Sequence, residues 1–233
     1  MSAPMSTPTS REHALLNNTK LDLATAAALT AATAVTFVLV GIGSALHHIQ
    51  KVDDSFLRVM LSHRSGALTA IAKVFNVLGT TPVTWPVRIL LAGFLAFRRR
   101  WWHFAAFVAA MVISEALIGT LKHVYGRARP PVHPLVRISG ASFPSGHAVA
   151  TSVTVAAVVI AFVPSGWHRW LWGLGAGVFS FVMALSRVYL GAHWLSDAVA
   201  GTLLGTTVAL DSALVVQWIR SRASARAPAP APT

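Results

Sequence analysis

The sequence contains no cysteine and few acidic residues, and both shortages exclude types of site. Without a cysteine among its 233 residues, the chain has neither a disulfide framework nor a thiolate metal site. Only 7 residues are Asp or Glu, and they form no cluster along the chain that would hold magnesium. The chain also lacks an internal repeat. The fold must therefore rest on packing, and the sequence predicts no metal and no cofactor.

Apolar residues, by contrast, are abundant. Hydrophobic residues make up 55% of the sequence, charged residues make up 11%, and the mean hydropathy is +0.61. This composition lies outside the range of ordinary soluble domains and is typical of an integral membrane protein. A chain of 233 residues fits one domain of about six spanning helices, since each helix needs roughly 20 apolar residues. No room is left for a second globular domain.

Apolar segments predict where the membrane spans lie. They cover residues 24–46, 78–97, 102–121, 146–163, 169–188 and 194–219. The first segment is too long for the core of a signal peptide, so we expect it to be retained. Very short links at 98–100 and 164–168 make the second and third spans, and the fourth and fifth, antiparallel pairs. The predicted fold class is all-α, an integral membrane bundle of six transmembrane helices with both links on one side.

The remaining segments complete the domain organisation. Residues 52–76 mix apolar and charged residues in an amphipathic pattern, which predicts a helix along the membrane surface between the first and second spans. We expect a disordered lead over 1–23, a membrane domain over 24–219, and a disordered tail over 220–233, which is rich in Ala and Pro. Apolar surfaces facing lipid and facing a partner subunit look alike in sequence, so no oligomeric state is predicted.

Three charged residues, Arg88, Glu115 and Asp211, lie well away from the ends of the predicted spans. Glu115 lies well inside the third span and Arg88 at a similar depth in the second, and intramembrane charges are costly unless they are paired. We predict a buried Arg88–Glu115 pair that fixes this hairpin, with a proton-relay role as the alternative. Head groups more than about 6 Å apart would contradict the pair. Asp211, in the sixth span, is predicted to be structural, without a named partner.

The net charge of +12 admits nucleic acid, anionic lipid or a phosphorylated substrate as a partner. The positions of the cations favour lipid and phosphate over nucleic acid, because many of them lie in short stretches where spans end. The stretch "KHVYGRARP" (122–130) places Lys122 and Arg129 about two helical turns, or roughly 10 Å, apart. If the helix continues until Pro130 and Pro131 stop it, the two cations share a face.

Two further stretches reach the same side. The stretch "PSGH" (144–147) offers a hydroxyl, accessible backbone N–H groups and an imidazole at the N-terminus of a span, where the helix dipole favours an anion. The stretch "SRVYLGAHWLSD" (186–197) puts Arg187 at the end of the fifth span, His193 in the turn, and Asp197 one helical turn later. A carboxylate at that spacing is able to hold and polarise an imidazole.

Taken alone, each of these residues has a simpler interpretation. Lys122 and Arg129 could extend toward lipid headgroups, and Ser145 could be an ordinary N-cap. His193 and Asp197 could be a structural pair at a helix start. The combination favours phosphate chemistry, in which cations and N–H donors neutralise the equatorial oxygens, a nucleophile attacks in line, and an acid protonates the leaving oxygen.

The three stretches also resemble a known signature. KxxxxxxRP (122–130), PSGH (144–147) and SRxxxxxHxxxD (186–197) are similar to the three-part signature of the type 2 phosphatidic acid phosphatase superfamily. That superfamily includes membrane lipid phosphate phosphatases and vanadium haloperoxidases. All three parts are intact and in order, and the six-span layout extends the resemblance to residues 24–219. The resemblance implies a metal-independent phosphatase that works through a phosphohistidine intermediate.

Roles for individual residues follow from the same resemblance. It implies that His193 is the nucleophile, that Asp197 orients its ring, and that His147 protonates the leaving group. It also implies that the phosphoryl group is bound by Lys122, Arg129, Ser145, Gly146 (through its backbone) and Arg187. A histidine nucleophile makes chemical sense, because neutral imidazole is available near pH 7 and a carboxylate stabilises the positive phosphohistidine.

The substrate and some rival functions stay open at this point. Polyprenyl diphosphate, phosphatidylglycerophosphate, phosphatidate and diacylglycerol pyrophosphate all present a terminal phosphoryl group at the interface, and an outward site with short loops favours a polyprenyl diphosphate. A non-enzymatic carrier or scaffold for anionic lipids would leave the His193 and Asp197 spacing unexplained. An intramembrane serine protease using Ser145 with His193 would leave the cations unused. The apolar spans argue against a haloperoxidase and for a lipid-linked substrate.

The positive-inside rule predicts the orientation in the membrane only when the cations of the candidate site are left out of the count. Nine Lys and Arg residues lie on the side of the two termini and nine on the opposite side. If Lys122, Arg129 and Arg187 are held by function, the comparison becomes nine against six and favours cytoplasmic termini with an outward-facing site. Abundant alanine and the resemblance favour a bacterial inner membrane. The predicted partners are a lipid-linked phosphate or diphosphate substrate and membrane lipids.

Overall fold

The computed structural model describes residues 14–16 and 20–225. Within these residues the chain is helical and has no strand, which confirms the all-α prediction. The helices are α1 (Lys20–Gly41), α2 (Gly43–Ser62), α3 (Gly66–Leu78), α4 (Thr81–Phe97), α5 (Trp101–Tyr125), α6 (Gly146–Phe162), α7 (Trp167–Tyr189) and α8 (Leu195–Ala225).

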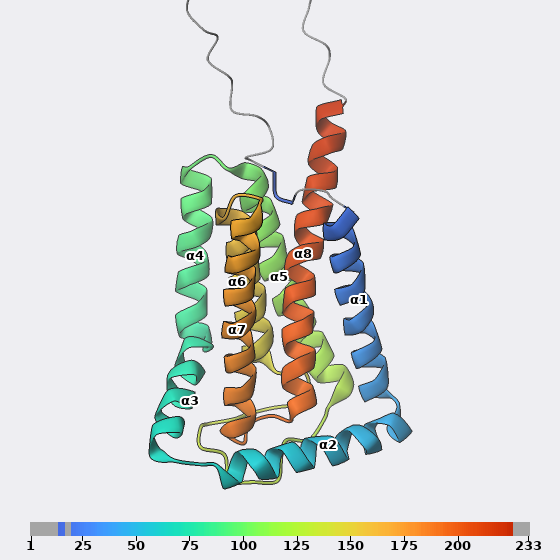
Figure 1. The fold of residues 1–233 in the computed structure, drawn as a ribbon, viewed down its shortest axis with the longest axis vertical. Helices are drawn as coiled ribbons and strands as arrows, with labels where there is room; N and C mark the ends of the chain where they lie inside the picture. The colour runs from blue at the N-terminus through green and yellow to red at the C-terminus, as the bar shows by residue number, and fades with distance from the viewer. Residues whose placement is uncertain (1–13, 17–19, 226–233) are drawn as a thin grey trace, which may run out of the picture.

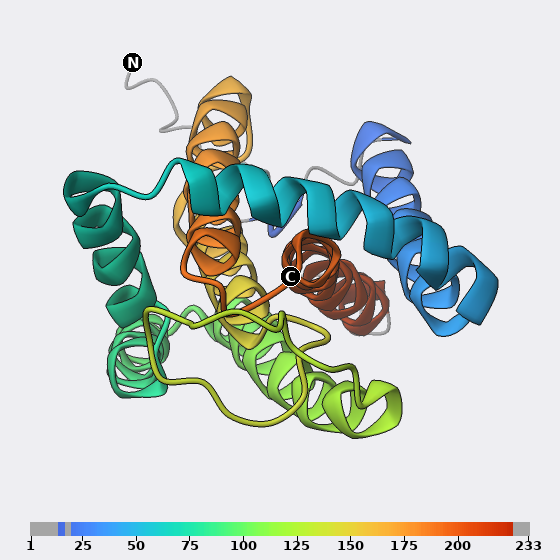
Figure 2. The same ribbon diagram turned by 90° about the horizontal axis from the view of Figure 1, so that it is seen from below.

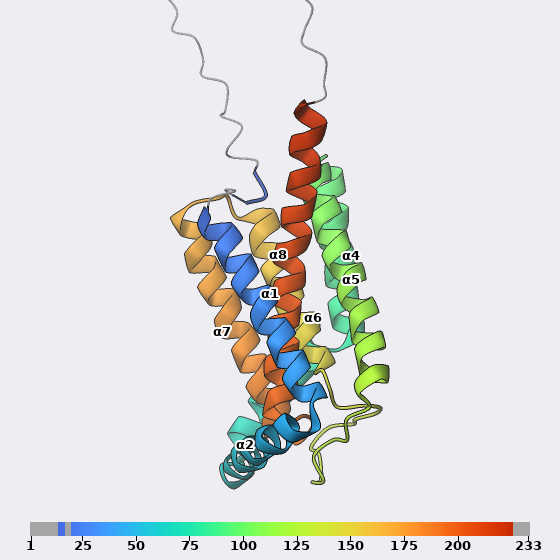
Figure 3. The same ribbon diagram turned by 90° about the vertical axis from the view of Figure 1, so that its right-hand side faces the viewer.

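Most helices run along the long axis of the molecule (Figure 1). Helices α1, α4, α5, α6, α7 and α8 stand side by side, while α2 crosses beneath them and α3 leads into α4. Helix α8 packs against α6, α5, α1 and α7, so it occupies the centre of the bundle, as the side view also shows (Figure 3). The short links between α4 and α5 and between α6 and α7 lie at the end opposite α2. The two predicted antiparallel pairs are therefore present.

Four helices are long and apolar enough to cross a membrane: α1, α5, α7 and α8. Helices α3 and α4 pass the same test only as a pair, and they are bent by 51° where they meet. Helix α6 is apolar but has only 17 residues. Four or five spans thus follow from length and composition, and the count of six stays a prediction.

Several predicted boundaries differ from the observed ones. The span expected over 24–46 ends at Gly41, and residues 43–46 already belong to α2, because two glycines flank the break at Ile42. The amphipathic stretch 52–76 is divided between α2 and α3, and the Ser65 hydroxyl caps α3 by accepting a hydrogen bond from the Leu68 N–H at 3.3 Å. Helices α1 and α8 extend into the predicted lead and tail, whose remaining parts mostly lie outside the described residues.

Close packing of α6 against α8 depends on two glycines four residues apart. A Cβ atom at Gly201 would lie 2.7 Å from the Ser145 carbonyl oxygen, and one at Gly205 would lie 2.5 Å from the Val149 carbonyl oxygen. No side chain fits at such distances, so the glycines set the approach of the two helices, as small residues do between membrane helices. This contact brings the start of α6 next to the start of α8, which carry two of the signature stretches.

The three charged residues predicted to lie within the spans each have a hydrogen-bond partner. Arg88 Nη1 donates to Glu115 Oε1 at 2.6 Å, which confirms the predicted pairing, although only the Arg88 side chain is buried and that of Glu115 is 37% exposed. Arg88 also donates to the Thr154 hydroxyl at 2.9 Å and to the Ala150 carbonyl at 3.0 Å, so it joins α4 and α5 to α6 as well. Asp211 of α8 has a partner that the sequence did not suggest. Its carboxylate accepts a hydrogen bond from the Thr30 hydroxyl of α1 at 3.1 Å.

Candidate active site

The three signature stretches meet at the end of the bundle where α2 crosses it. Seen from below, α2 runs across the ends of α7 and α8, and the loop of residues 126–145 lies beside it (Figure 2). The start of α6, the end of α7 and the start of α8 all reach this end. The eight predicted site residues therefore come from four helices, α5, α6, α7 and α8, and from the two connections 126–145 and 190–194, which converge on one face.

Lys122 and Arg129 reach the site differently from the prediction. Helix α5 ends at Tyr125 because Gly126 adopts a left-handed conformation with φ of 51°, so the helix does not continue to the prolines. Lys122 stays on the last turn of α5 and donates to the Ala141 carbonyl at 2.6 Å. Arg129 comes from the loop and donates to the Ala192 carbonyl at 2.6 Å. The prediction that Lys122 and Arg129 share one helix face was therefore wrong, but both side chains contact the loop that contains Ala141.

The contacts of His193 indicate which of its two ring nitrogens carries the proton. Arg129 Nη1 lies 3.2 Å from His193 Nε2, and a guanidinium only donates, so Nε2 is the acceptor. The ring proton is therefore on Nδ1, which faces Asp197 Oδ2 at 3.4 Å. That separation is longer than an ordinary hydrogen bond, and His193 Nδ1 has no hydrogen-bond partner among the described residues. The lone pair of Nε2 points away from Asp197, as a nucleophile requires.

Burial keeps the His193 imidazole neutral. Removal from solvent lowers the pKa of His193 from 6.5 to about 4, and Arg187 and Arg129 act in the same direction, while Asp197 opposes them. Burial also lowers the pKa of Arg129, again opposed by Asp197. Near neutral pH the site thus combines an unprotonated imidazole with cationic neighbours, which suits attack on an anionic phosphoryl group.

Ser145 does not behave as an ordinary N-cap. It is the residue before α6, yet its hydroxyl makes no capping hydrogen bond. Its Oγ, together with His147 Nε2 and Arg187 Nε, is buried without a hydrogen-bond partner among the described residues. Buried polar atoms are seldom left unpaired, so these three groups are candidates to bind a polar ligand. All three belong to the signature stretches.

Helix α3 adds two residues that the sequence analysis missed. Arg187, at the end of α7, donates through Nη1 to the Asn76 side chain, and Arg187 is only 2% exposed. A Cβ atom at Gly79 would lie 2.6 Å from His147 Cδ2, so a glycine is needed where α3 passes the imidazole. Neither residue stands out in the sequence, because each contact joins positions far apart in the chain.

A second missed group surrounds Asp197. The Arg127 guanidinium donates to Asp197 Oδ1 at 2.7 Å and to Asp53 Oδ2 of α2 at 2.7 Å. The Ser142 hydroxyl donates to the other oxygen of Asp197. A signal for Asp53 was present in the sequence. It is one of only 7 acidic residues and lies one helical turn before Leu57 on the amphipathic stretch, so both face the protein.

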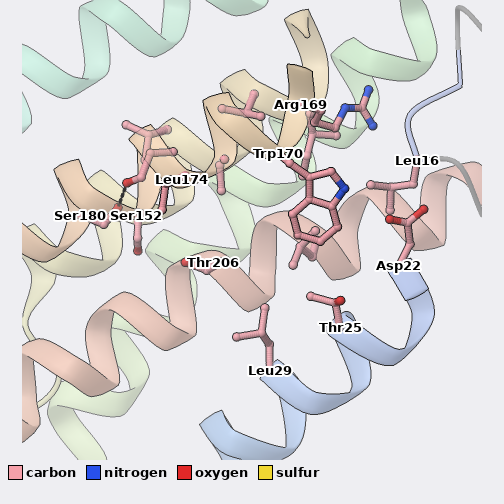
Figure 4. Close-up of a pocket in the computed structure, with 18 of the residues that line it drawn as sticks. Leu16, Asp22, Thr25, Leu29, Ser152, Arg169, Trp170, Leu174, Ser180 and Thr206 are labelled. Atoms are coloured by element: carbon pink, nitrogen blue, oxygen red, sulfur yellow. Dashed lines mark hydrogen bonds between the residues drawn. The ribbon is translucent and has the colours of Figure 1, made fainter. Parts of the chain in front are cut away.

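A cavity of about 480 Å³ lies elsewhere, between α1 and α7 (Figure 4). Its walls include Leu29, Trp170 and Leu174, with Asp22 and Arg169 also on its lining. None of the predicted site residues lines it. Its mostly apolar walls suit hydrocarbon rather than phosphate, so the convergence of the signature stretches stays the candidate active site.

The sequence also matches a family of known proteins. Residues 101–222 match the family model of the PAP2 superfamily. The chain belongs to this superfamily. All three signature stretches fall within the matched range, so the resemblance drawn from them is confirmed. PAP2 proteins are phosphatases, and this chain is therefore an enzyme of that class.

Individual relatives agree with the PAP2 assignment. Phosphatidylglycerophosphatase B from Bacillus subtilis is 27% identical over 161 residues, which are 67% of this chain and 79% of the relative. Decaprenylphosphoryl-5-phosphoribose phosphatase from Mycobacterium tuberculosis is 35% identical over 155 residues, 64% of this chain and 80% of the relative. A crystal structure of a transmembrane PAP2 type phosphatidylglycerolphosphate phosphatase from Bacillus subtilis superposes with a TM-score of 0.69 at 23% identity, covering 84% of this chain and 96% of that chain. This last likeness shows a shared fold and, with the apolar helices, an integral membrane protein.

Proposed function

We propose that this PAP2 chain removes the terminal phosphate of a lipid-linked phosphate or diphosphate through a phosphohistidine intermediate. One observation carries the proposal. The unprotonated His193 Nε2, which accepts a hydrogen bond from Arg129, lies in a site where Ser145 Oγ, His147 Nε2 and Arg187 Nε have no partner among the described residues. The serine hydroxyl and the guanidinium are donors, and so is the imidazole when its Nε2 carries a proton. Phosphoryl oxygens are the acceptors that would complete this set.

In the first step, His193 Nε2 attacks the phosphorus atom in line with the leaving oxygen. An N–P bond forms, the P–O bond to the lipid breaks, and His147 gives a proton to the departing oxygen. Lys122, Arg129 and Arg187 neutralise the charge on the phosphoryl oxygens, so the proposed reaction uses no metal. The amides at the start of α6, including that of Gly146, point toward the same anion.

In the second step, water replaces the histidine. His147, now neutral, takes a proton from water, the resulting oxygen attacks phosphorus, and the N–P bond breaks to release inorganic phosphate. Asp197 stabilises the positive charge on the phosphohistidine in both steps because it faces Nδ1. His193 returns to its neutral form with the proton on Nδ1.

For the substrate we favour a polyprenyl diphosphate, with phosphatidylglycerophosphate and phosphatidate as competitors. Two relatives support lipid-linked substrates through their names, one for a decaprenyl compound and one for phosphatidylglycerophosphate. We further propose six spans in a bacterial inner membrane, with α4 and the short α6 completing the set, cytoplasmic termini and an outward-facing site. The balance of cations after removal of the three site residues supports this orientation.

Phosphate release by the detergent-purified protein in EDTA tests the proposal. The assay compares polyprenyl diphosphate, phosphatidylglycerophosphate and phosphatidate, and it includes the His193→Ala variant. We expect release with at least one lipid, loss of release in the variant, and an acid-labile phosphoenzyme in the native protein alone. Absence of release from every lipid by a folded protein would overturn the proposal and favour a carrier or scaffold for anionic lipids.

A further inference from the structure

Asp197 makes several contacts besides the one with His193. It is fully buried, and both carboxylate oxygens are engaged. Oδ1 accepts a hydrogen bond from Arg127 Nη1 at 2.7 Å, and Oδ2 accepts one from the Trp194 N–H at 3.0 Å and one from the Ser142 hydroxyl. The position and effective charge of Asp197 therefore depend on these donors, and Arg127 is the only cation among them.

Arg127 is shared between two carboxylates. Its side chain is 7% exposed and forms ion pairs at 2.7 Å with Asp197 of α8 and at 2.7 Å with Asp53 of α2. Its Nη2 also donates to Gln50 Oε1 of α2 at 2.8 Å. A guanidinium has a rigid planar fork, so one arginine fixes the distance between the two helices.

Asp53 holds the start of α8 by a second route. Its side chain is 1% exposed, although it lies on the helix predicted to run along the membrane surface. Oδ1 accepts the Ser196 N–H at 2.8 Å, and Oδ2 accepts the Ser196 hydroxyl at 2.6 Å. Ser196 directly precedes Asp197, so Asp53 satisfies an N–H group at the N-terminus of α8 and places the backbone next to the carboxylate.

The sharing of Arg127 has an electrostatic consequence. Two buried carboxylates and one guanidinium leave one net negative charge, so Arg127 does not fully neutralise Asp197. Asp197 therefore keeps enough negative charge to stabilise the positive phosphohistidine. If Asp53 lost its charge, Arg127 would pair with Asp197 alone, and the hold of Asp197 on His193 would weaken.

We propose that Asp53 and Arg127 are positioning residues for His193 that act through Asp197, so that α2 is part of the catalytic apparatus. This inference rests on the proposed function, because it takes His193 as the nucleophile. It concerns the rate at which the N–P bond forms, and it leaves the binding of the phosphoryl group to the signature cations.

The adjacent acids of α2 provide a matched test. Asp53→Asn removes the shared charge, whereas Asp54→Asn makes the same change one residue later, where the carboxylate contacts Gln50. For Asp53→Asn we expect kcat to fall about 10- to 100-fold, as for other residues that orient a catalytic group, with KM within about twofold of the native value. The rate of phosphoenzyme formation in a single turnover should fall in parallel. For Asp54→Asn we expect kcat within about threefold of native.

Further measurements separate positioning from folding. Inhibition by inorganic phosphate should be unchanged in Asp53→Asn, because the phosphoryl-binding cations are intact. Ser196→Ala removes the hydrogen bonds that its hydroxyl makes with Asp53 and Arg127 but keeps both charges, so its kcat should fall less than that of Asp53→Asn. Equal kcat in the Asp53 and Asp54 variants, or a loss in Asp53→Asn that appears only as less folded protein at unchanged turnover, would overturn the inference. If the native protein forms no phosphoenzyme and releases no phosphate, the proposed function fails instead.

Discussion

Two regions of this bundle contain buried arginines, and they differ in how their polar atoms are satisfied. In the middle of the bundle, Arg88 donates to Glu115, Thr154 and the Ala150 carbonyl. At the end where the signature stretches meet, Arg187 keeps a buried Nε without a partner among the described residues. The first arrangement is complete and holds three helices together. The second leaves a donor that the proposed phosphoryl substrate would satisfy, and this difference distinguishes a structural cation from the proposed substrate-binding one.

Removing the nucleophile should have the largest effect on the functional region. In His193→Ala we expect phosphate release to fall by about 10⁴-fold or more, because no other group at the site forms the covalent intermediate. The Tm should change little, since the ring makes few strong contacts. Phosphate release and a thermal unfolding curve on the same preparation check both parts. Activity within tenfold of native would contradict the assignment of His193.

Exchanging each arginine for methionine tests the comparison directly. In Arg187→Met we expect kcat/KM to fall about 10²- to 10³-fold, because one donor to the transition-state charge is lost, while the Tm stays close to native. In Arg88→Met we expect the reverse, with a clear drop in Tm and turnover per folded molecule within about threefold of native.

The Glu115 partner supplies a control for the second half of that prediction. Arg88→Met leaves the half-buried Glu115 carboxylate without its ion-pair partner, within a span that is predicted to lie in the membrane. The double variant Arg88→Met/Glu115→Met should therefore recover part of the lost Tm. A double variant less stable than the single one would mean that the pair itself contributes little.

Disturbing the contact between α6 and α8 should have a smaller effect, on both stability and turnover. In Gly201→Ala the new methyl group meets the Ser145 carbonyl, so α6 must move away from α8. We expect a loss of about 1–3 kcal/mol in stability and about a tenfold loss in kcat, because Ser145 and His193 shift relative to each other. Gly173→Ala in α7 is the matched control, since nothing lies within 4 Å of its Cβ position. Equal effects in the two variants would remove the role given to the α6–α8 contact.

The smallest expected effect is that of pH on the protonation of His193 above pH 5. With a pKa of about 4 in the folded protein against 6.5 in the unfolded chain, His193 stays neutral as the pH falls from 8 to 5. Because the unfolded chain binds this proton more readily, the stability that His193 contributes is present above pH 6.5 and is lost as the pH falls toward 4. Nitrogen NMR of labelled histidine, assigned with His193→Ala, should show a midpoint near 4. A midpoint near 6.5 would contradict the buried, neutral nucleophile.

Local chemistry made much of this fold predictable. Long apolar segments identified the bundle helices, and the cost of charge inside a membrane limited the partners of Glu115 so strongly that Arg88 was the natural choice. The signature stretches identified the candidate site, because their residue types suit the binding of phosphate. Errors arose where two local signals competed. Gly126 and Pro130 both stop helices, and the glycine acts first.

Contacts between distant segments were the part that sequence reasoning did not reach. Asn76 meets Arg187 across 111 positions, and Arg127 meets Asp53 across 74. The sequence pattern within α2 or α3 does not indicate which other helix packs against it. The break at residues 63–65 turns the chain from α2 into α3, and this turn brings both helices over the site.

Helix α8 has a practical consequence for experiments on the intact enzyme. It contains 31 residues without a break, so it is roughly 45 Å long, and it joins Asp197 at one end to Trp218 and Arg222 near the other. Its last turns extend past the neighbouring helices (Figure 1). A fluorescent reporter fused after the tail would thus be attached at the end of the bundle farthest from His193, where it reports the side of the membrane that the termini occupy. Attachment to a surface through the same end would leave the catalytic face open to lipid vesicles.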